Sequence, residues 1–442
     1  YPEAPAPVVT PHRGAYWPFL PFLDLLVALP AVMVLLRAHV RDALPTLLVA
    51  CGYQPHGHLD GRAVDIEEVY ESVGKVGAGH ITLERLGAMC DVAIQGPGVC
   101  AGMGTANTMH IAAEVLGLAL PGSTPVLANG DRMFAFAEAA GRRIVQMVNE
   151  DLRPSAILTP QAFENAVMAG LALSASINLV RHLQAIAAEA RCPVDIYELY
   201  DRLGPKIPLL AAVRPNGETR IEELEAAGGT LGVMKRLGAL IHRDALTVSG
   251  RTWGTEIDVA PEAGAVIRTV DNPLSRKPSV IVMRGNLAPE GSILKVGDAG
   301  AKQSLFEGKA LVFTSQEEAL AALKAGRLVR GTVAVLAGMG CRGGPGMALA
   351  SGFVAAVDGA GLSTMVAVIT DGQLSGLNRG IAIGQVAPEA ALGGQLGLVR
   401  DGDAITIDME AHRVTLEVGE AELASRRATL KPHKGADERG WL

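Results

Sequence analysis

The sequence predicts an α/β protein with a helix-rich N-terminal part and a strand-rich C-terminal part. The 442-residue chain contains 52 glycines and only 4% aromatic residues, a composition typical of α/β proteins with many tight turns. Apolar residues recur at helical spacing in the part of the chain before Thr269. Beyond Thr269, short β-branched runs alternate with glycines, which indicates a closed or nearly closed β structure.

The N-terminal part is expected to begin with a strand and continue with helices. Residues 44–51 form an apolar run that predicts a strand leading into a loop rich in Gly and His. Thr159 is placed to cap a helix, and a helical run follows at 166–190 with an interruption near 174–178. Earlier helices are predicted from their apolar stripes at 65–74, 105–116 and 132–149.

The C-terminal part is predicted to consist mainly of strands. Ser315 and Glu318 fit the start of one short helix, 315–325, with Ser315 as the N-cap. The expected strands are 280–283, 311–313, 332–336, 366–369, 404–407 and 413–418. We therefore expect domains at 43–272 and 273–442. Residues 1–42, rich in proline and then apolar, fit neither domain and are expected to be disordered or degenerate.

The bulk composition excludes several classes of protein. With 39 basic and 46 acidic residues, a net charge of −7 argues against a nucleic-acid surface. The apolar stretch 18–36 contains Asp24 and three prolines, so a membrane span is not expected. Five widely spaced cysteines without a CxxC pair indicate neither a disulfide framework nor a zinc ribbon, and we expect a cytoplasmic protein.

The most informative motif is a Gly-framed turn that presents the hydroxyl of Ser375 after a buried strand. Glycines allow the main chain to approach a ligand closely, so a polar side chain among them is a candidate functional group. This motif is ITDGQLSG at 369–376, and it is accompanied by GVCAGMGTANTM at 98–109, RGGPGM at 342–347, APEA at 387–390 and GLVRDGD at 397–403.

Together these motifs resemble the dihydroxy-acid dehydratase / phosphogluconate dehydratase family, which includes sugar-acid dehydratases. The resemblance runs from about residue 43 to about 428 and includes LPGS at 120–123, LTPQAFENA at 158–166, AGG at 227–229 and RGNLAP at 284–289. It implies an N-terminal α/β domain, a C-terminal swivelling β-barrel-like domain and an active site between them. It also implies a hydro-lyase that converts a 2,3-dihydroxy acid to a 2-keto acid, with an iron–sulfur cluster and Mg²⁺.

The resemblance assigns roles to individual residues. Ser375 matches the serine that acts as base, and Cys100 matches the last of three cysteines that bind the cluster. Ser176 and Asn178 stand near the substrate in the family, although they could equally satisfy local backbone groups. Arg342 replaces a family lysine and is a candidate carboxylate ligand, with a plain surface role as the alternative.

Asp371 has two interpretations. It is expected to fix its turn by accepting backbone N–H bonds, with direct catalysis as the less favoured alternative.

The chain departs from the family at its metal ligands. Leu25, Leu26 and Val27 occupy the places of a Cys-Asp-Lys run, and Leu349 occupies that of a Mg²⁺ glutamate. Family histidines near the base serine are replaced in Asn378-Arg379-Gly380 and Gly384-Gln385. Because clusters need thiolates and Mg²⁺ needs oxygen ligands, this chain as written is expected to bind neither. The substitutes considered are Cys51, Cys90, Cys341, His56 and His58, none of them favoured.

Two hypotheses for function follow. The first is an impaired hydro-lyase acting on a small hydroxy acid, with the natural metal-binding region absent from this chain. The second is a metal-free homologue that keeps the fold for binding or assembly. On either hypothesis we expect a homodimer or homotetramer without nucleic-acid or membrane partners, because the mean hydropathy of +0.27 leaves apolar surface to cover.

Overall fold

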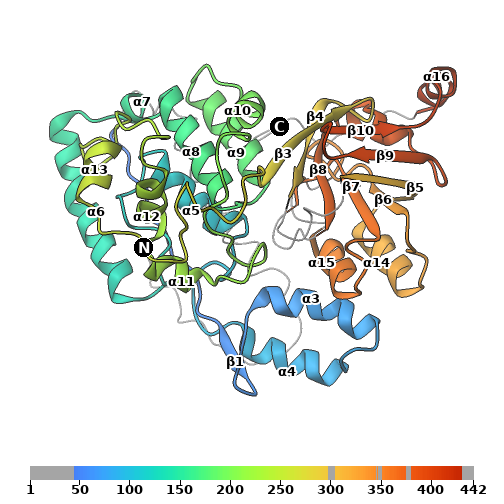
Figure 1. The fold of residues 1–442 in the computed structure, drawn as a ribbon, viewed down its shortest axis with the longest axis horizontal. Helices are drawn as coiled ribbons and strands as arrows, with labels where there is room; N and C mark the ends of the chain where they lie inside the picture. Colours follow the sequence, from blue (N-terminus) through green and yellow to red (C-terminus); the bar gives the residue numbers. More distant parts are fainter. Residues whose placement is uncertain (1–43, 297–303, 345, 347–350, 375–379, 431–442) are drawn as a thin grey trace, which may run out of the picture.

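The computed structural model describes residues 44–296, 304–344, 346, 351–374 and 380–430. A helical part and a β-barrel lie side by side, and a small unit of two helices lies below their junction (Figure 1). The predicted fold class is therefore confirmed. Residues 1–42, to which the sequence assigned a separate segment, fall outside the described residues.

The helical part follows the periodicity of the sequence closely. Asp65 caps α3 through its side chain, as the acidic first turn predicts, and Thr159 caps α8. The break predicted near 174–178 separates α8 from α9. The elements are β1 (Gly57–Leu59), β2 (Arg62–Val64), α3 (Ile66–Gly77), α4 (Leu83–Ala93), α5 (Thr105–Val115), α6 (Asp131–Glu150), α7 (Pro154–Ile157), α8 (Pro160–Ala172), α9 (Asn178–Glu189), α10 (Ile196–Leu203), α11 (Ile221–Ala226), α12 (Gly229–Leu237) and α13 (Trp253–Val259).

The strand predicted at 44–51 is wrong. This segment makes a single isolated bridge, in which the Leu48 N–H donates to the Leu118 carbonyl at 2.7 Å. Leu47 and Leu48 are apolar because they pack against the helical core, which needs no sheet neighbours. Just beyond this segment, Tyr53 forms isolated bridges with both Val99 and Leu127.

Eight strands of the described chain close into a barrel. Neighbouring strands follow the order β10-β3-β4-β8-β7-β6-β5-β9. Strands β5 to β8 run parallel, with α14 (Gln316–Lys324) after β5 and α15 (Ser351–Gly359) after β6. The strands are β3 (Val280–Gly285), β4 (Ala288–Lys295), β5 (Leu305–Phe313), β6 (Thr332–Leu336), β7 (Val366–Thr370), β8 (Ile381–Ala387), β9 (Ala404–Asp408) and β10 (Arg413–Leu416), followed by α16 (Glu420–Ala428).

Alternation along the strands divides the barrel residues between two cores. Leu294 and Ile383 face the barrel interior, whereas Ile293 and Val280 join the core of the helical part. Side chains of period two point to opposite faces of a strand, so the outer face of β3 and β4 packs on helices and not on water. This part of the junction between the two parts is consequently apolar.

Glycine makes a second contact between the parts possible. Helix α3 packs on α15 of the barrel, where a Cβ on Gly74 would lie 2.2 Å from the Ala356 carbonyl oxygen. The small α3–α4 unit is therefore fixed against the barrel beneath the junction (Figure 1).

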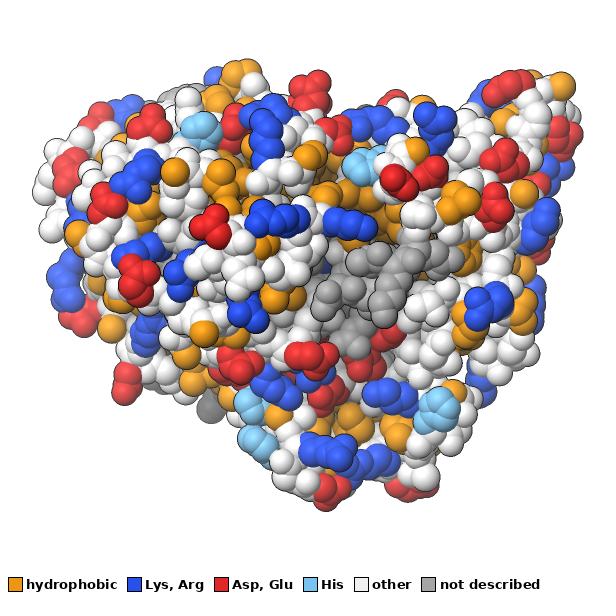
Figure 2. Space-filling view, in the orientation of Figure 1, with side chains coloured by type: hydrophobic (Ala, Val, Ile, Leu, Met, Phe, Trp, Pro, Cys, Tyr) orange, Lys and Arg blue, Asp and Glu red, His pale blue; other side chains and the backbone are white. Residues whose placement is uncertain are grey.

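The charges on the protein surface are mixed. On the face shown in Figure 2, acidic and basic side chains intermingle without a large region of one sign. No helix of the described ranges is long and apolar enough to cross a membrane.

Candidate active site at the junction of the two parts

The loop that carries Cys100 is held by the first turns of α5. The Asn107 amide donates to the carbonyl oxygens of Cys100 and Gly102, each at 2.8 Å. The Met103 N–H donates to the Arg214 carbonyl at 2.7 Å. Burial, with the nearby Glu67 as a second cause, raises the pKa of the partly buried Cys100 thiol to about 12. In this state of the protein the thiol stays protonated at neutral pH.

Glu67 lies deep beside this loop. Its side chain is 3% exposed, and neither carboxylate oxygen has a hydrogen-bond partner among the described residues. A Cβ on Gly102 would lie 1.8 Å from Glu67 Oε1, so only glycine lets the loop approach so closely. Burial, reinforced by Asp65, raises the pKa of Glu67 to about 8.

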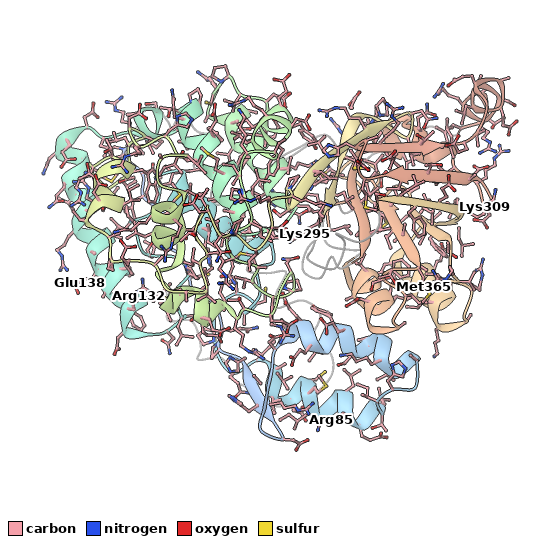
Figure 3. The ribbon with its side chains drawn as sticks, in the orientation of Figure 1. Arg85, Arg132, Glu138, Lys295, Lys309 and Met365 are labelled. Carbon is pink, nitrogen blue, oxygen red and sulfur yellow. The ribbon has the colours of Figure 1, made fainter. Side chains whose placement is uncertain are left out.

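Lys295 approaches the same region from the barrel. It ends β4, is 2% exposed, and lies at the junction of the two parts (Figure 3). No other lysine of the described ranges is buried. Burial lowers the pKa of Lys295 to about 7, and the charge of Glu67 opposes that change. A buried carboxyl and a buried amine from opposite parts of the chain thus share one site.

Ser176 and Asn178 lie between the Cys100 loop and the barrel. The Ser176 hydroxyl lies 3.0 Å from Thr105 Oγ1, and the Asn178 amide donates to the same oxygen at 2.9 Å. The Ser176 N–H donates to Thr108 Oγ1 at 3.0 Å. Both side chains therefore bind the N-terminal end of α5, whose Asn107 holds the Cys100 loop.

A bulge in β8 connects this turn to the barrel. Gly291 pairs with Ala387 and Ile293 with Gly384, which leaves one extra residue on β8. Gln385 has a φ of 59° there, and its side-chain amide donates to the Ile177 carbonyl at 3.0 Å. Bulges re-aim side chains in this way. Gln385 thus holds the turn between Ser176 and Asn178.

Asp371 fixes the loops at the end of the parallel strands. Its buried carboxylate accepts the N–H groups of Gly338 at 3.1 Å, Met339 at 2.8 Å and Ala390 at 2.9 Å. The predicted role in fixing the turn is therefore observed. Leu374, the last described residue before Ser375, lies close to Gly384, as does Ile177 of the helical part.

Arg342 lies in a neighbouring turn at the same end of the barrel. Its backbone N–H donates to Glu389 at 2.8 Å, and Glu389 also accepts from the Cys341 N–H at 3.1 Å. Arg181 of α9 reaches the same carboxylate at 3.4 Å. Glu389 therefore joins the Arg342 turn to the helical part.

The structure thus brings three of the predicted residues together. Cys100, Ser176 and Asn178 meet around the start of α5, and Arg342 lies in the Glu389 turn. Ser375, Leu349, Asn378 and the aligned residues 25–27 lie outside the described residues.

The described donor groups near Cys100 do not by themselves complete the ligand set of an iron–sulfur cluster or of Mg²⁺. Among the described residues, no group of three or more His, Cys, Asp or Glu side chains could hold a metal ion. Cys51 lies 3.5 Å from His110, and His56 forms an ion pair with Glu222 at 2.6 Å. These contacts give the two considered substitutes other partners. We therefore derive no chemical step through a metal.

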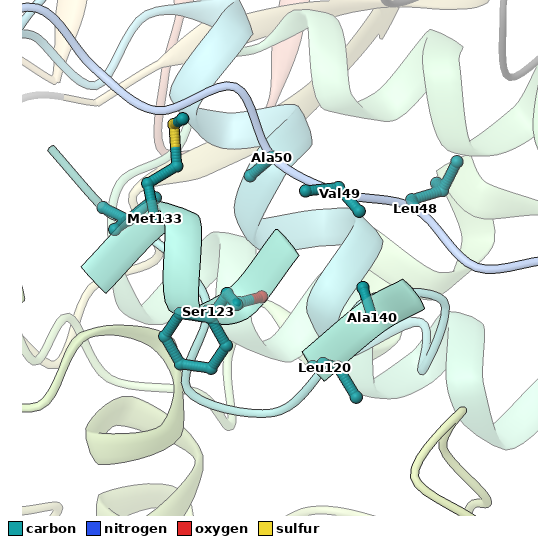
Figure 4. A pocket seen from close by; sticks show the side chains of 9 residues that line it. Leu48, Val49, Ala50, Leu120, Ser123, Met133 and Ala140 are labelled. Atoms are coloured by element: carbon teal, nitrogen blue, oxygen red, sulfur yellow. The ribbon is translucent and has the colours of Figure 1, made fainter. Parts of the chain in front are cut away.

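An apolar pocket lies elsewhere on the helical part. It is formed between 48–50 and α6, and Ser123 supplies the polar side chain of its lining (Figure 4). A surface with so few polar groups cannot orient a hydroxy acid, so it is not part of the candidate site.

Sequence reasoning missed Glu67 and Lys295. Glu67 reads as one of several acidic residues in the first turn of α3, where such residues are common on the surface. The sequence did contain a signal for Lys295, because it lies two residues after Ile293 and therefore on the same strand face, which is otherwise apolar. Strand β4 was not predicted, however, and the alternation was not recognised.

Comparisons with known proteins agree with the fold. The dihydroxy-acid/6-phosphogluconate dehydratase N-terminal profile matches residues 29–256, and the C-terminal profile matches 265–442. The chain is 42% identical to the dihydroxy-acid dehydratase of Pyrococcus furiosus over 401 residues, which cover 90% of this chain and 72% of that protein. It is 40% identical to the dihydroxy-acid dehydratase of Caldicellulosiruptor saccharolyticus over 411 residues, 92% and 74% of the two chains.

These matches define the class of protein, a dehydratase whose N-terminal and C-terminal family models cover the helical part and the barrel in turn. The chain belongs to the dihydroxy-acid/6-phosphogluconate dehydratase family, whose members are hydro-lyases.

Proposed function

We propose that this chain is a hydro-lyase that converts a small 2,3-dihydroxy acid to a 2-keto acid at the junction site, with activity impaired in the chain as written. The observation that carries the proposal is the continuous set of hydrogen bonds from the Cys100 loop, through α5, to Ser176, Asn178 and Gln385. These contacts bring the motifs expected near the substrate into one buried region between the two parts.

The residues of the site have separable roles in this proposal. Ser375 is the base that removes the C2 proton, and the Asp371-fixed turn positions the segment that leads to it. Ser176 and Asn178 offer groups to substrate hydroxyls, and Arg342 is the candidate carboxylate ligand of the neighbouring turn. Ser176 and Asn178 are buried, so water is kept from their polar groups and their interactions are strengthened.

Metal content is the reason for the proposed impairment. In the family an iron–sulfur cluster assists the leaving hydroxide and Mg²⁺ holds the carboxylate and C2 oxygen. Cys100 supplies one thiol, and the donors described around it do not complete either ligand set. We propose that this chain binds neither group firmly and that its turnover is near background.

The alternative is a metal-free homologue that keeps the fold for binding or assembly. One observation favours it: Gln385 uses its amide to hold the Ile177 turn, a structural use of a position where the family often has a titratable histidine. On both hypotheses we propose a cytoplasmic homodimer or homotetramer with domains at 43–272 and 273–442. The end of α13 at Val259 and the start of β3 at Val280 support that boundary.

The test compares keto-acid formation by the anaerobically purified chain and its Ser375→Ala variant. Substrates are 2,3-dihydroxy-3-methylbutanoate, gluconate and 6-phosphogluconate, each with and without added Fe²⁺, sulfide and Mg²⁺. Slow turnover that the Ser375→Ala variant lacks supports the hydro-lyase. Equal background rates for both proteins under every condition, with retained binding of an acid, would establish the metal-free homologue instead.

A further inference from the structure

The direction of the Lys295 side chain follows from its strand. In β4, Ile293 packs into the helical core and Leu294 into the barrel interior. Side chains two apart share a face, so Lys295 extends from the barrel toward the helical part. Its cross-strand partner Val280 belongs to the same helical-side core. The ammonium group therefore stands in the junction and not inside the barrel.

Lys295 has no counter-ion at close range in the described part of the chain. No carboxylate oxygen there lies within 4.0 Å of the Lys295 ammonium group, the limit for an ion pair. Glu67 is the charged group whose electrostatic effect raises the pKa of Lys295. Glu67 is in turn influenced more by Asp65 and Arg214 than by Lys295. Neither buried group is thus neutralised by the other.

A buried amine with no carboxylate in ion-pair range is costly to keep charged in a folded protein. If Lys295 and Glu67 formed a structural ion pair, their charged atoms would lie in direct contact, as those of Arg214 and Glu68 do at 2.8 Å in the same region. Because Lys295 and Glu67 do not pair with each other, they instead suit a ligand that offers a negative group to the Lys295 ammonium and a polar group to the Glu67 carboxyl. The hydroxy acids of the proposed reaction carry both.

We infer that Lys295 joins Arg342 in binding the carboxylate of the acid on which the junction site acts, an inference that rests on the proposed function. The ammonium group offsets the negative charge next to the C2 proton. That proton is a weak acid largely because of the carboxylate beside it, and enolate charge develops at the same place as the proton leaves. Lys295 would then be a substrate-binding residue supplied by the barrel.

The experiment measures binding and protection in the full chain. Calorimetry compares 2,3-dihydroxy-3-methylbutanoate with its uncharged amide for the wild type, Lys295→Met and Lys309→Met. Lys309 is an exposed lysine of β5 and provides the matched control (Figure 3). In parallel, reductive methylation followed by peptide mass spectrometry reports whether that acid, gluconate or lactate shields Lys295.

We expect the acid to bind and its amide to bind poorly. Lys295→Met should weaken acid binding by about 30-fold, the usual effect of losing a charge-assisted hydrogen bond, whereas Lys309→Met should not change it. Equal affinity of the acid for the wild type and Lys295→Met would overturn the inference and leave the proposed function standing.

The protection measurement separates the two proposals further. Shielding of Lys295 by lactate with no affinity for either dihydroxy acid would support the carboxylate site while refuting the proposed substrate class. Methylation of Lys295 in the free protein that none of the three acids reduces would overturn the inference. Methionine matches the apolar stem of lysine and removes a desolvated charge, so the thermal midpoint of Lys295→Met should not fall. A lowered midpoint would mark Lys295 as a structural counter-ion and also overturn the inference.

Discussion

Replacing Glu67 by glutamine should change how the stability of the protein depends on pH. Burial raises the pKa of Glu67 from its ordinary 4.5 to about 8, so the folded chain keeps a proton that the unfolded chain has lost. The folded state then binds more protons, and the free energy of unfolding falls as pH rises from 4.5 to about 8. The slope is about 1.4 kcal/mol per pH unit below pH 7 and flattens near the folded-state pKa, which gives about 2 kcal/mol between pH 6 and pH 8.

Glutamine carries no titrating proton, so Glu67→Gln removes this part of the pH dependence. Below about pH 4.5 the two proteins should have similar stability, and the variant should be the more stable by about 2 kcal/mol at pH 6 and about 4 kcal/mol at pH 8. Urea unfolding at pH 6, 7 and 8 measures the difference, with Glu138→Gln on the exposed face of α6 as control (Figure 3). Parallel pH profiles for wild type and Glu67→Gln would show that the Glu67 carboxyl is not desolvated as described.

Three further substitutions or measurements test other parts of the structure. Asp371→Ala leaves three buried N–H groups without an acceptor and should cost about 3–5 kcal/mol in urea unfolding, with Asp371→Asn costing less; a loss below about 1 kcal/mol would contradict the assigned role. Trp253→Phe removes the bond from Nε1 to the Val115 carbonyl at 3.0 Å and should cost about 1–2 kcal/mol, measured by thermal melting with Trp253→Ala as the larger, cavity-forming comparison. Anaerobically purified protein should contain far less than stoichiometric iron and sulfide and show no cluster absorbance in the visible region; a stoichiometric cluster would direct attention to Cys51, Cys90 or Cys341 as additional ligands.

Periodicity predicted the regular elements well where local signals and tertiary packing agree. The helix at Thr159 and the strand Thr332–Leu336 are examples, since a polar cap and a continuous β-branched run leave few alternatives. Strand β4 was missed because Pro289 and Gly291 interrupt its apolar pattern. The apolar run at 44–51 was misassigned because packing against helices leaves the same sequence signal as packing in a sheet.

The site was harder to predict than the fold, since its charged members depend on tertiary contacts. The family motifs gave Cys100, Ser176 and Asn178, and the structure connects them through α5. Glu67 becomes unusual only when the Gly102 backbone covers its carboxylate. No local pattern encodes that contact, because residues 67 and 102 meet only after the chain folds.

The shared core at the junction has a consequence for how the chain folds during synthesis. Val280 and Ile293 of the barrel complete a core whose other members, such as Ile177 and Leu179, lie about a hundred residues earlier in the sequence. On the ribosome the helical part therefore emerges with an apolar face that cannot yet be covered. At typical elongation rates of about 5–20 residues per second, this face stays exposed for several seconds until the barrel strands follow. The nascent chain is thus most vulnerable to aggregation at that stage, and a chaperone that shields the face of α9 would act before the barrel exists.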